Sequence, residues 1–177
     1  MPAVANRCAG GVSVSGWRQE LRRLLGKGAF IVGVGNALKG DDAFGPEVIR
    51  RINYQKKLDA GTVPENFLSK LERDGPKAIL LIDAVDFGGR PGEIRLFAAE
   101  EAENPNISTH TLSLRHFAHF FGGCEVRLLG VQPETNEFGA GLSASMAKAV
   151  EEVVEAINAD AAVAERKRGR QQKCNQI

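Results

Sequence analysis

Several acidic residues stand directly after apolar segments of the sequence, where their carboxylates could act together. Asp41 and Asp42 follow the first apolar run, and Asp83 ends the most apolar run of the chain. Asp59 ends a shorter segment between them. Because ligands of open α/β sheets bind beyond the carboxyl ends of parallel strands, we expect these acids to meet at one edge of a sheet. Carboxylates that lie close together repel each other and need protons, hydrogen bonds or a cation as compensation.

A histidine adds a nitrogen donor to this set. His110 lies in the polar turn Ser-Thr-His-Thr before a predicted helix. With Asp42 and Asp83 it would form a mixed oxygen and nitrogen site, which suits Ni(II) or Zn(II) better than Ca²⁺. Each residue also has a purely structural interpretation, because acids and histidines in such turns often cap the helix that follows. The roles of Asp41 and Asp86 stay open.

Other motifs favour structural interpretations. His116 and His119 share a predicted helix with several phenylalanines, which is typical of an amphipathic helix packed beside aromatic side chains. Gly33 and Gly35 follow a strand as in a dinucleotide-binding turn, but Leu38 stands where the third glycine belongs. The sequence has no Gly-Lys-Ser/Thr phosphate loop and no Gly-x-Ser-x-Gly elbow, so nucleophilic catalysis is less favoured.

Composition narrows the class of protein. The chain has 177 residues and a net charge of +1, which fits one globular domain and argues against a nucleic-acid-binding protein. Its 3 cysteines are scattered, which fits a reducing cytoplasm. The sequence has no apolar stretch long enough to predict a membrane helix, and its first residues lack the apolar core of a signal peptide.

Strands and helices are expected to alternate, which implies an α/β fold with a parallel or mixed sheet covered on both faces. We expect a disordered extension over 1–15, a single domain over 16–160 and a basic tail over 161–177. Apolar runs and alternation predict strands at 29–34, near 59, at 78–83, at 92–97 as a half-exposed or edge strand, and at 125–131. Helical spacing predicts helices at 15–25, from about 45, at 64–71, at 111–121 and at 142–157.

An ordered set of motifs resembles the hydrogenase maturation endopeptidases. The segment 33–45, GVGNALKGDDAFG, is similar to their opening signature, in which a Gly-x-Gly-Asn turn leads to an acidic pair and a glycine. Further similarities follow in order at LDAGT (58–62), IDAVD (82–86), PGEIR (91–95), STHTL (108–112) and GVQP (130–133). The resemblance covers residues from about 30 to about 157, and the Asp-Asp pair is most similar to the branch that serves formate-hydrogenlyase-type and archaeal hydrogenases.

The resemblance implies a fold, an activity and a set of site residues. The fold would be a three-layer α/β/α arrangement around a twisted, mostly parallel five-stranded sheet. The protein would be a cytoplasmic, monomeric endopeptidase of aspartic type that removes the C-terminal extension from the nickel-loaded precursor of a [NiFe] hydrogenase large subunit. Carried over by position, the metal contacts are Asp42, Asp83 and His110. Nickel would come with the precursor, and zinc or cadmium could serve as a surrogate ion.

The catalytic step is less determined than the metal contacts. We expect Asp42, Asp59 and Asp83 to form the catalytic acids, with Asp59 as the leading candidate for activating water. A pair of acids that shares a proton is an alternative. Three other functions remain open at this point: a nickel carrier without peptidase activity, a nucleotide-binding module at the Gly33–Gly35 turn, and a general metal-dependent peptidase, against which the absence of His-Glu-x-x-His argues.

Overall fold

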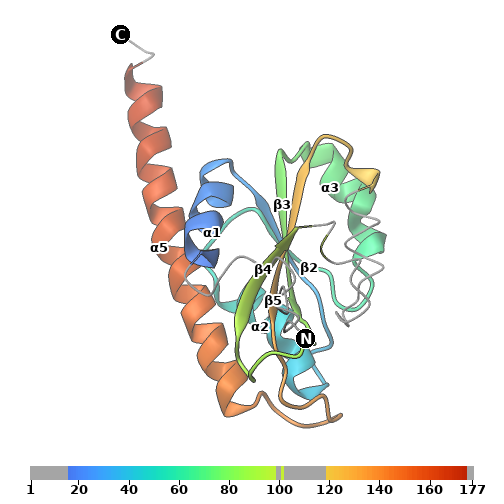
Figure 1. Cartoon of the computed structure of the whole chain (residues 1–177). Coiled ribbons are helices and arrows are strands. Elements are labelled where there is room, and N and C mark those ends of the chain that lie inside the picture. The colour runs from blue at the N-terminus through green and yellow to red at the C-terminus, as the bar shows by residue number, and fades with distance from the viewer. Residues whose placement is uncertain (1–15, 99–100, 102–118, 175–177) are drawn as a thin grey trace, which may run out of the picture.

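The computed structural model describes residues 16–98, 101 and 119–174, with side chains described up to residue 163. Four α-helices, two short 3-10 helices and five strands lie within these residues (Figure 1). The helices are α1 (Trp17–Gly26), η1 (Gly40–Ala43), α2 (Phe44–Arg51), η2 (Pro64–Phe67), α3 (Leu68–Asp74) and α5 (Ala144–Cys174). The strands are β1 (Phe30–Gly33), β2 (Lys57–Asp59), β3 (Ala78–Ala84), β4 (Ile94–Ala98) and β5 (Glu125–Val131).

The strands form one mostly parallel sheet in the order β2-β1-β3-β5-β4. Only β4 runs antiparallel, and it lies at the edge of the sheet beside β5, as its alternating sequence predicted. The chain moves from β1 outward to β2 and then returns to place β3 on the other side of β1. This reversal makes the crevice between β1 and β3 the topological switch point, the place where open α/β sheets bind their ligands.

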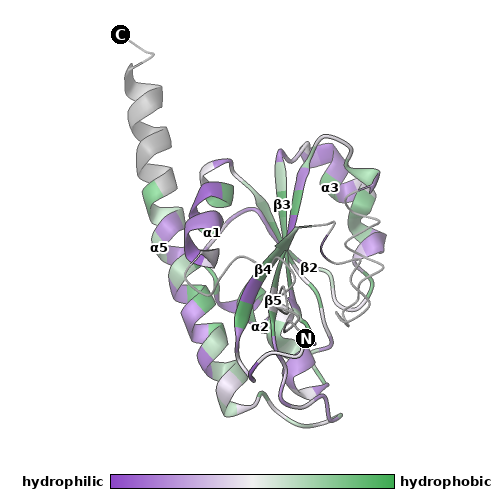
Figure 2. Cartoon of the chain, viewed as in Figure 1, coloured by the Kyte–Doolittle hydropathy of each residue, from purple (hydrophilic) through white to green (hydrophobic). Residues whose placement is uncertain are grey.

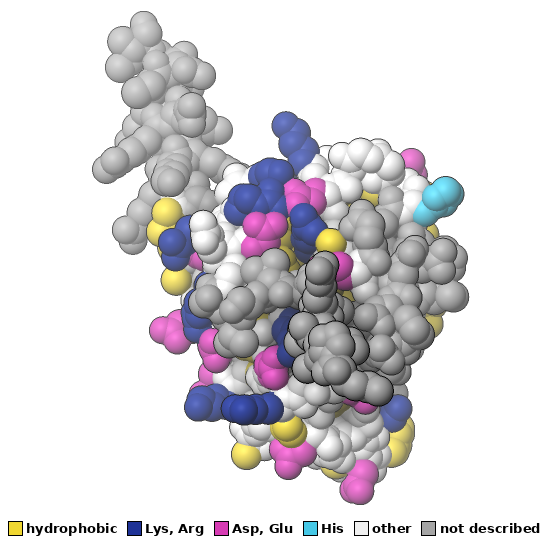
Figure 3. All heavy atoms as spheres, viewed as in Figure 1, with side chains coloured by type: hydrophobic (Ala, Val, Ile, Leu, Met, Phe, Trp, Pro, Cys, Tyr) yellow, Lys and Arg dark blue, Asp and Glu magenta, His cyan; other side chains and the backbone are white. Residues whose placement is uncertain are grey.

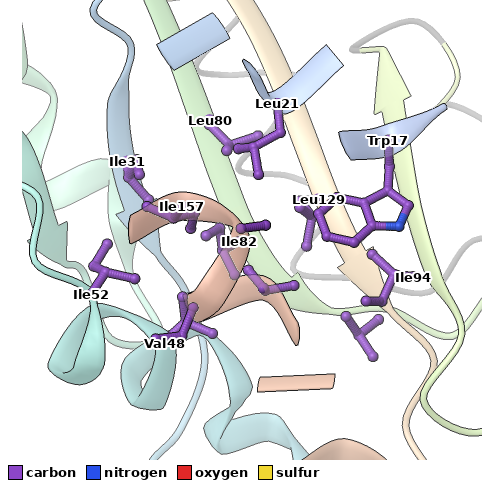
Figure 4. Packing of buried hydrophobic residues seen from close by; sticks show 14 of the residues in the cluster. Trp17, Leu21, Ile31, Val48, Ile52, Leu80, Ile82, Ile94, Leu129 and Ile157 are labelled. Atoms are coloured by element: carbon purple, nitrogen blue, oxygen red, sulfur yellow. The ribbon is translucent and has the colours of Figure 1, made fainter. Parts of the chain in front are cut away.

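Helices cover both faces of the sheet, which confirms the predicted three-layer α/β/α fold. The larger hydrophobic cluster lies under α1, α2 and α5, where Ile157 of α5 packs toward Ile31 and Leu80 of the sheet (Figure 4). Trp17 of α1 is fully buried in the same cluster. A second cluster lies on the opposite face, where Leu71 of α3 packs against β1, β3 and β5. Helices and strands turn their apolar residues toward these two interiors (Figure 2).

Some boundaries differ from those expected. The closing helix, expected over 142–157, is α5 and continues to Cys174, so residues 161–174 of the expected basic tail are helical. The segment expected as a loop before residue 45 contains η1, and the helix expected over 64–71 is divided into η2 and α3. The expected extension 1–15 and most of the expected helix 111–121 lie outside the described residues. None of the described helices is long and apolar enough to cross a membrane.

Candidate active site

Glycines of the 33–45 segment allow η1 and α2 to pack directly on the sheet. A Cβ atom on Gly45 would lie 2.2 Å from the carbonyl oxygen of Val34 and 2.5 Å from that of Ile82. A Cβ atom on Gly35, whose φ is +135°, would lie 2.0 Å from the carbonyl oxygen of Asp42. Any larger residue at either position would push the acidic segment away from the strands. The glycines therefore have a packing role that explains their spacing without a bound nucleotide.

Asp41 is a structural residue of this edge. Its side chain is 0% exposed, and its carboxylate accepts hydrogen bonds from the backbone N–H groups of Glu134 (2.7 Å), Thr135 (3.2 Å) and Ser143 (2.7 Å). The Ser143 hydroxyl also donates to it at 2.9 Å. Asp41 thus ties η1 to the loop between β5 and α5, which answers the question of its role that the sequence left open.

Asp42 lies one residue further along η1. Its side chain is 9% exposed, and its Oδ2 accepts a hydrogen bond of 3.2 Å from the backbone N–H of Asn36. The Asp42 N–H donates to the carbonyl oxygen of Lys39 at 3.0 Å, which closes the turn. Because η1 follows β1 and contacts β3, Asp42 is placed at the switch point between these strands.

Asp83 occupies the other side of the same crevice. It lies near the carboxyl end of β3, where it pairs in register with Gly130 of β5, and it is 3% exposed. Ile82 packs into the larger cluster, so the alternation of the strand turns Asp83 toward the face covered by α3. The structure therefore places Asp42, on η1 after β1, and Asp83, on the adjacent strand β3, at the switch point.

Asp59 is placed differently. It ends β2, which lies on the far side of β1 from β3, and its side chain is exposed. Its Oδ1 accepts a hydrogen bond of 3.0 Å from the Gly61 N–H, which closes a local turn. Lys57, two residues earlier, donates to carbonyl oxygens at the end of α2, so the alternation places Asp59 on the α2 side of the sheet. Asp59 shares the carboxyl edge with the other two acids but faces the side of the sheet opposite to Asp83.

The predicted histidine ligand, His110, lies in a part of the chain that the structure does not describe. His110 and His116 lie outside the described residues, whereas His119 is described and exposed. Within the described part of the chain, no group of three or more His, Cys, Asp or Glu side chains could hold a metal ion. The expected metal set of Asp42, Asp83 and His110 thus stays a prediction, since one member of it is not described.

Sequence reasoning missed the role of one buried polar residue near this edge. Gln132, just past β5, accepts hydrogen bonds from the N–H groups of Phe87 (2.9 Å) and Gly89 (3.0 Å) and donates to Asp86 Oδ1 (3.0 Å). This contact, together with the Gly88 N–H, lowers the pKa of Asp86. Gln132 therefore holds the loop after β3. The only signal of this role in the sequence was the position of Gln132 in the Gly-Val-Gln-Pro segment (130–133).

The fold and the acidic pair define a class of protein, an open α/β protein whose switch point carries two buried carboxylates. A family model described as hydrogenase maturation protease matches residues 47–160 of the chain. The chain belongs to the hydrogenase maturation protease family. It is therefore a peptidase, as the resemblance implied, and the nickel carrier is not favoured.

Relatives of known name agree with this family. A putative hydrogenase maturation protease of Methanocaldococcus jannaschii is 35% identical over 124 residues, which span 61% of this chain and 73% of that protein. The hydrogenase 3 maturation protease of Escherichia coli K12 is 32% identical, over 68% of this chain and 82% of its own. The crystal structure of the HycI protease of Thermococcus kodakarensis has the same fold, with a TM-score of 0.69, 23% identity and coverage of 80% of this chain and 98% of that one.

Proposed function

We propose that this peptidase removes a C-terminal extension from the precursor of a [NiFe] hydrogenase large subunit, and that it recognises the precursor by its nickel. The observation that carries the proposal is the pair of buried acids, Asp42 and Asp83, at the switch point of the sheet. Support for the substrate comes from the names of the relatives, which are proteases of hydrogenase maturation.

Nickel enters this account as part of the substrate. Asp42 and Asp83 offer carboxylate oxygens, and His110 would add a nitrogen, a donor set that Ni(II) accepts and for which zinc or cadmium could act as a surrogate. A precursor that carries nickel would bring a positive charge to these two carboxylates. A precursor without nickel would lack the contacts between the metal and the carboxylates and would bind poorly.

The close packing at Gly35 and Gly45 would hold the site in a fixed orientation for recognition of the precursor. Because Gly35 and Gly45 let η1 and α2 pack closely on the sheet, Asp42 is held at the carboxyl edge. Asp41 fixes the same segment from the other side through Ser143 and the backbone of the loop. A site held in this way orients the bound precursor, and orientation lowers the barrier to cleavage of a single peptide bond.

Hydrolysis requires a group that accepts a proton from water while the water oxygen adds to the scissile carbonyl carbon. The C–N bond then breaks, and the amine of the extension leaves with a proton. Asp59 is our candidate for the water-activating group, because it lies at the carboxyl edge and is exposed to solvent. Its turn with the Gly61 N–H holds one carboxylate oxygen, Oδ1, in place.

The setting of the reaction is also part of the proposal. The scattered cysteines favour a reducing compartment, and we place the enzyme in the cytoplasm as a monomer. Cys124 is a free thiol whose pKa is raised by burial, which is consistent with a cysteine kept reduced and unreactive.

An intact-mass experiment tests the function. Purified protein is mixed with a hydrogenase large-subunit precursor, with and without its nickel centre. We expect loss of a C-terminal peptide from the nickel-loaded sample alone. Cleavage of both samples would contradict recognition by nickel, and transfer of nickel without cleavage would favour the carrier instead.

A further inference from the structure

Two large hydrophobic side chains project from the carboxyl edge close to Asp42. Phe138 is 75% exposed and Leu38 is 64% exposed, more than any other large hydrophobic residue in the described part of the chain. A third exposed residue, Val63, lies in the loop after β2 at the same edge. In Figure 3, hydrophobic and acidic side chains reach the surface together along the lower border, where Figure 1 places the carboxyl ends of the strands.

Leu38 and Phe138 belong to two loops that hold each other in place. We call residues 36–39 and 134–141 the loop rim. Lys39 and Phe138 form an antiparallel bridge, and the Gly139 N–H donates to the carbonyl oxygen of Leu38 at 2.8 Å. The Gly40 N–H donates to the carbonyl oxygen of Ala140 at 3.2 Å. These contacts present both apolar side chains on a fixed backbone, so little conformational entropy would be lost on binding.

The rim is continuous with the candidate active site. Leu38 stands in the same turn as Asn36, whose N–H holds Asp42. Asp41, the neighbour of Asp42, anchors the other loop of the rim through Glu134 and Thr135. Any polypeptide that reaches Asp42 from this side must therefore pass the rim. Exposed apolar groups in such a position mark a surface for a protein partner, because burying them on binding is favourable.

We propose that the loop rim is a docking surface for the hydrogenase large-subunit precursor, and that Leu38 and Phe138 bind apolar residues of the precursor beside the bond that is cut. The proposal rests on the proposed function for the identity of the partner. The rim also carries the exposed acids Glu134 and Glu137 against one base, Lys39, so it complements an apolar segment that is flanked by Lys or Arg.

The test uses the double variant Leu38→Ser/Phe138→Ser in the full chain. Phe120→Ser is the control, because Phe120 is likewise an exposed phenylalanine, at 45%, but precedes β5 at the opposite edge of the sheet. We expect the double variant to raise KM for the nickel-loaded precursor about ten-fold, with kcat changed less than about two-fold. The control should keep the wild-type KM, and all three proteins should show the same melting temperature.

Direct binding of the precursor, measured by calorimetry, separates failure of this inference from failure of the proposed function. If wild type cleaves and the double variant keeps its KM and affinity, the docking surface is wrong and the function stands. If wild type binds the precursor through the rim without cleaving it, the function is wrong and the surface stands. If wild type is a dimer that the double variant dissociates, with KM unchanged, the rim serves self-association and the proposal is overturned.

Discussion

The two edges of the sheet hold their acidic residues in different ways. At the amino edge, where β5 begins, Glu125 accepts hydrogen bonds from Arg23 and from Lys27, the latter at 2.8 Å. Arg23 also binds Glu20 at 2.6 Å, so charges of both signs alternate there. At the carboxyl edge, Asp41 is held by backbone N–H groups and a hydroxyl. In the part of the chain that the structure describes, neither Asp41 nor Asp42 forms an ion pair with Lys or Arg.

This difference separates an edge whose acids form ion pairs within the chain from an edge that we propose to bind a cation. Acids that are neutralised by arginine and lysine of the same chain stabilise the fold and attract nothing further. At the carboxyl edge, a backbone N–H group orients Asp42, and the proposed function gives this side chain a cation brought by a partner. Under the proposed function, the carboxyl edge receives nickel bound to a precursor, whereas ion pairs within the chain hold the acids of the amino edge.

The largest effect should come from adding one methyl group at each edge. Gly45→Ala places a Cβ against two carbonyl oxygens at the carboxyl edge, and we expect it to destabilise the fold by about 3 kcal/mol or more. Gly26→Ala, at the end of α1 near the amino edge, has open space for a Cβ and should be neutral or slightly stabilising. Urea denaturation measures the stability of both variants. Equal midpoints for Gly45→Ala and Gly26→Ala would contradict the tight packing of η1 and α2 on the sheet.

Removing an acid should cost more at the carboxyl edge than at the amino edge. Asp41→Ala leaves the N–H groups of Glu134, Thr135 and Ser143 without their acceptor, and we expect a loss of about 2–3 kcal/mol. Glu20→Ala removes a partly exposed ion pair with Arg23 and should cost about 1 kcal/mol or less. The free energy of unfolding of each variant measures the loss. A larger loss for Glu20→Ala than for Asp41→Ala would contradict the expected difference between the two edges.

Asp59→Asn tests whether the third acid takes part in chemistry. Asparagine can still accept the Gly61 N–H through its side-chain oxygen, so the melting temperature should stay at the wild-type value. We expect cleavage of the nickel-loaded precursor to slow about ten-fold, because an amide cannot take a proton from water. A wild-type rate would leave Asp59 as a turn residue only.

The smallest effect concerns pH dependence at the amino edge. The hydrogen bond from Arg23 lowers the pKa of Glu125 from 4.5 to about 2. Since the pKa in the folded state lies below the ordinary value, this stabilisation is complete above about pH 4.5 and is lost as the pH falls toward about 2. Glu125→Gln should therefore lose less stability than wild type across this window, by about 1 kcal/mol. Parallel acid-denaturation curves for the two proteins would contradict the strength of the contact.

The sequence predicted the layers of the fold and two positions of the candidate site. The apolar run that ends at Asp83 has to be a buried strand, because both of its faces are apolar, and its last residue must reach the carboxyl edge. The glycines of the 33–45 segment marked the turn that carries Asp42. These features follow from the local sequence pattern and from the rule that the carboxyl ends of parallel strands lie at one edge of the sheet. A single sequence is therefore enough to predict them.

Other features depend on tertiary contacts that no local pattern specifies. Asp41 and Asp42 are identical residues in adjacent positions, and only the contacts with Glu134, Thr135 and Ser143, 93 to 102 positions away, show that Asp41 is structural. The face on which Asp59 lies depends on the register of a very short strand. The segment after residue 160 was expected to be a basic tail outside the domain, but alanine and long charged side chains also favour a helix, and α5 continues to Cys174.

One measurement tests the central claim most directly: the rate at which Asp42→Asn cleaves the nickel-loaded precursor, recorded together with its melting temperature. The Asn36 N–H can bond to the amide oxygen as it does to the carboxylate, so the fold should be retained. We predict a rate at least about 100-fold lower, equivalent to about 2.7 kcal/mol, because the negative charge that meets the nickel is lost. Cleavage by a folded Asp42→Asn protein at the wild-type rate would contradict recognition through the acidic pair.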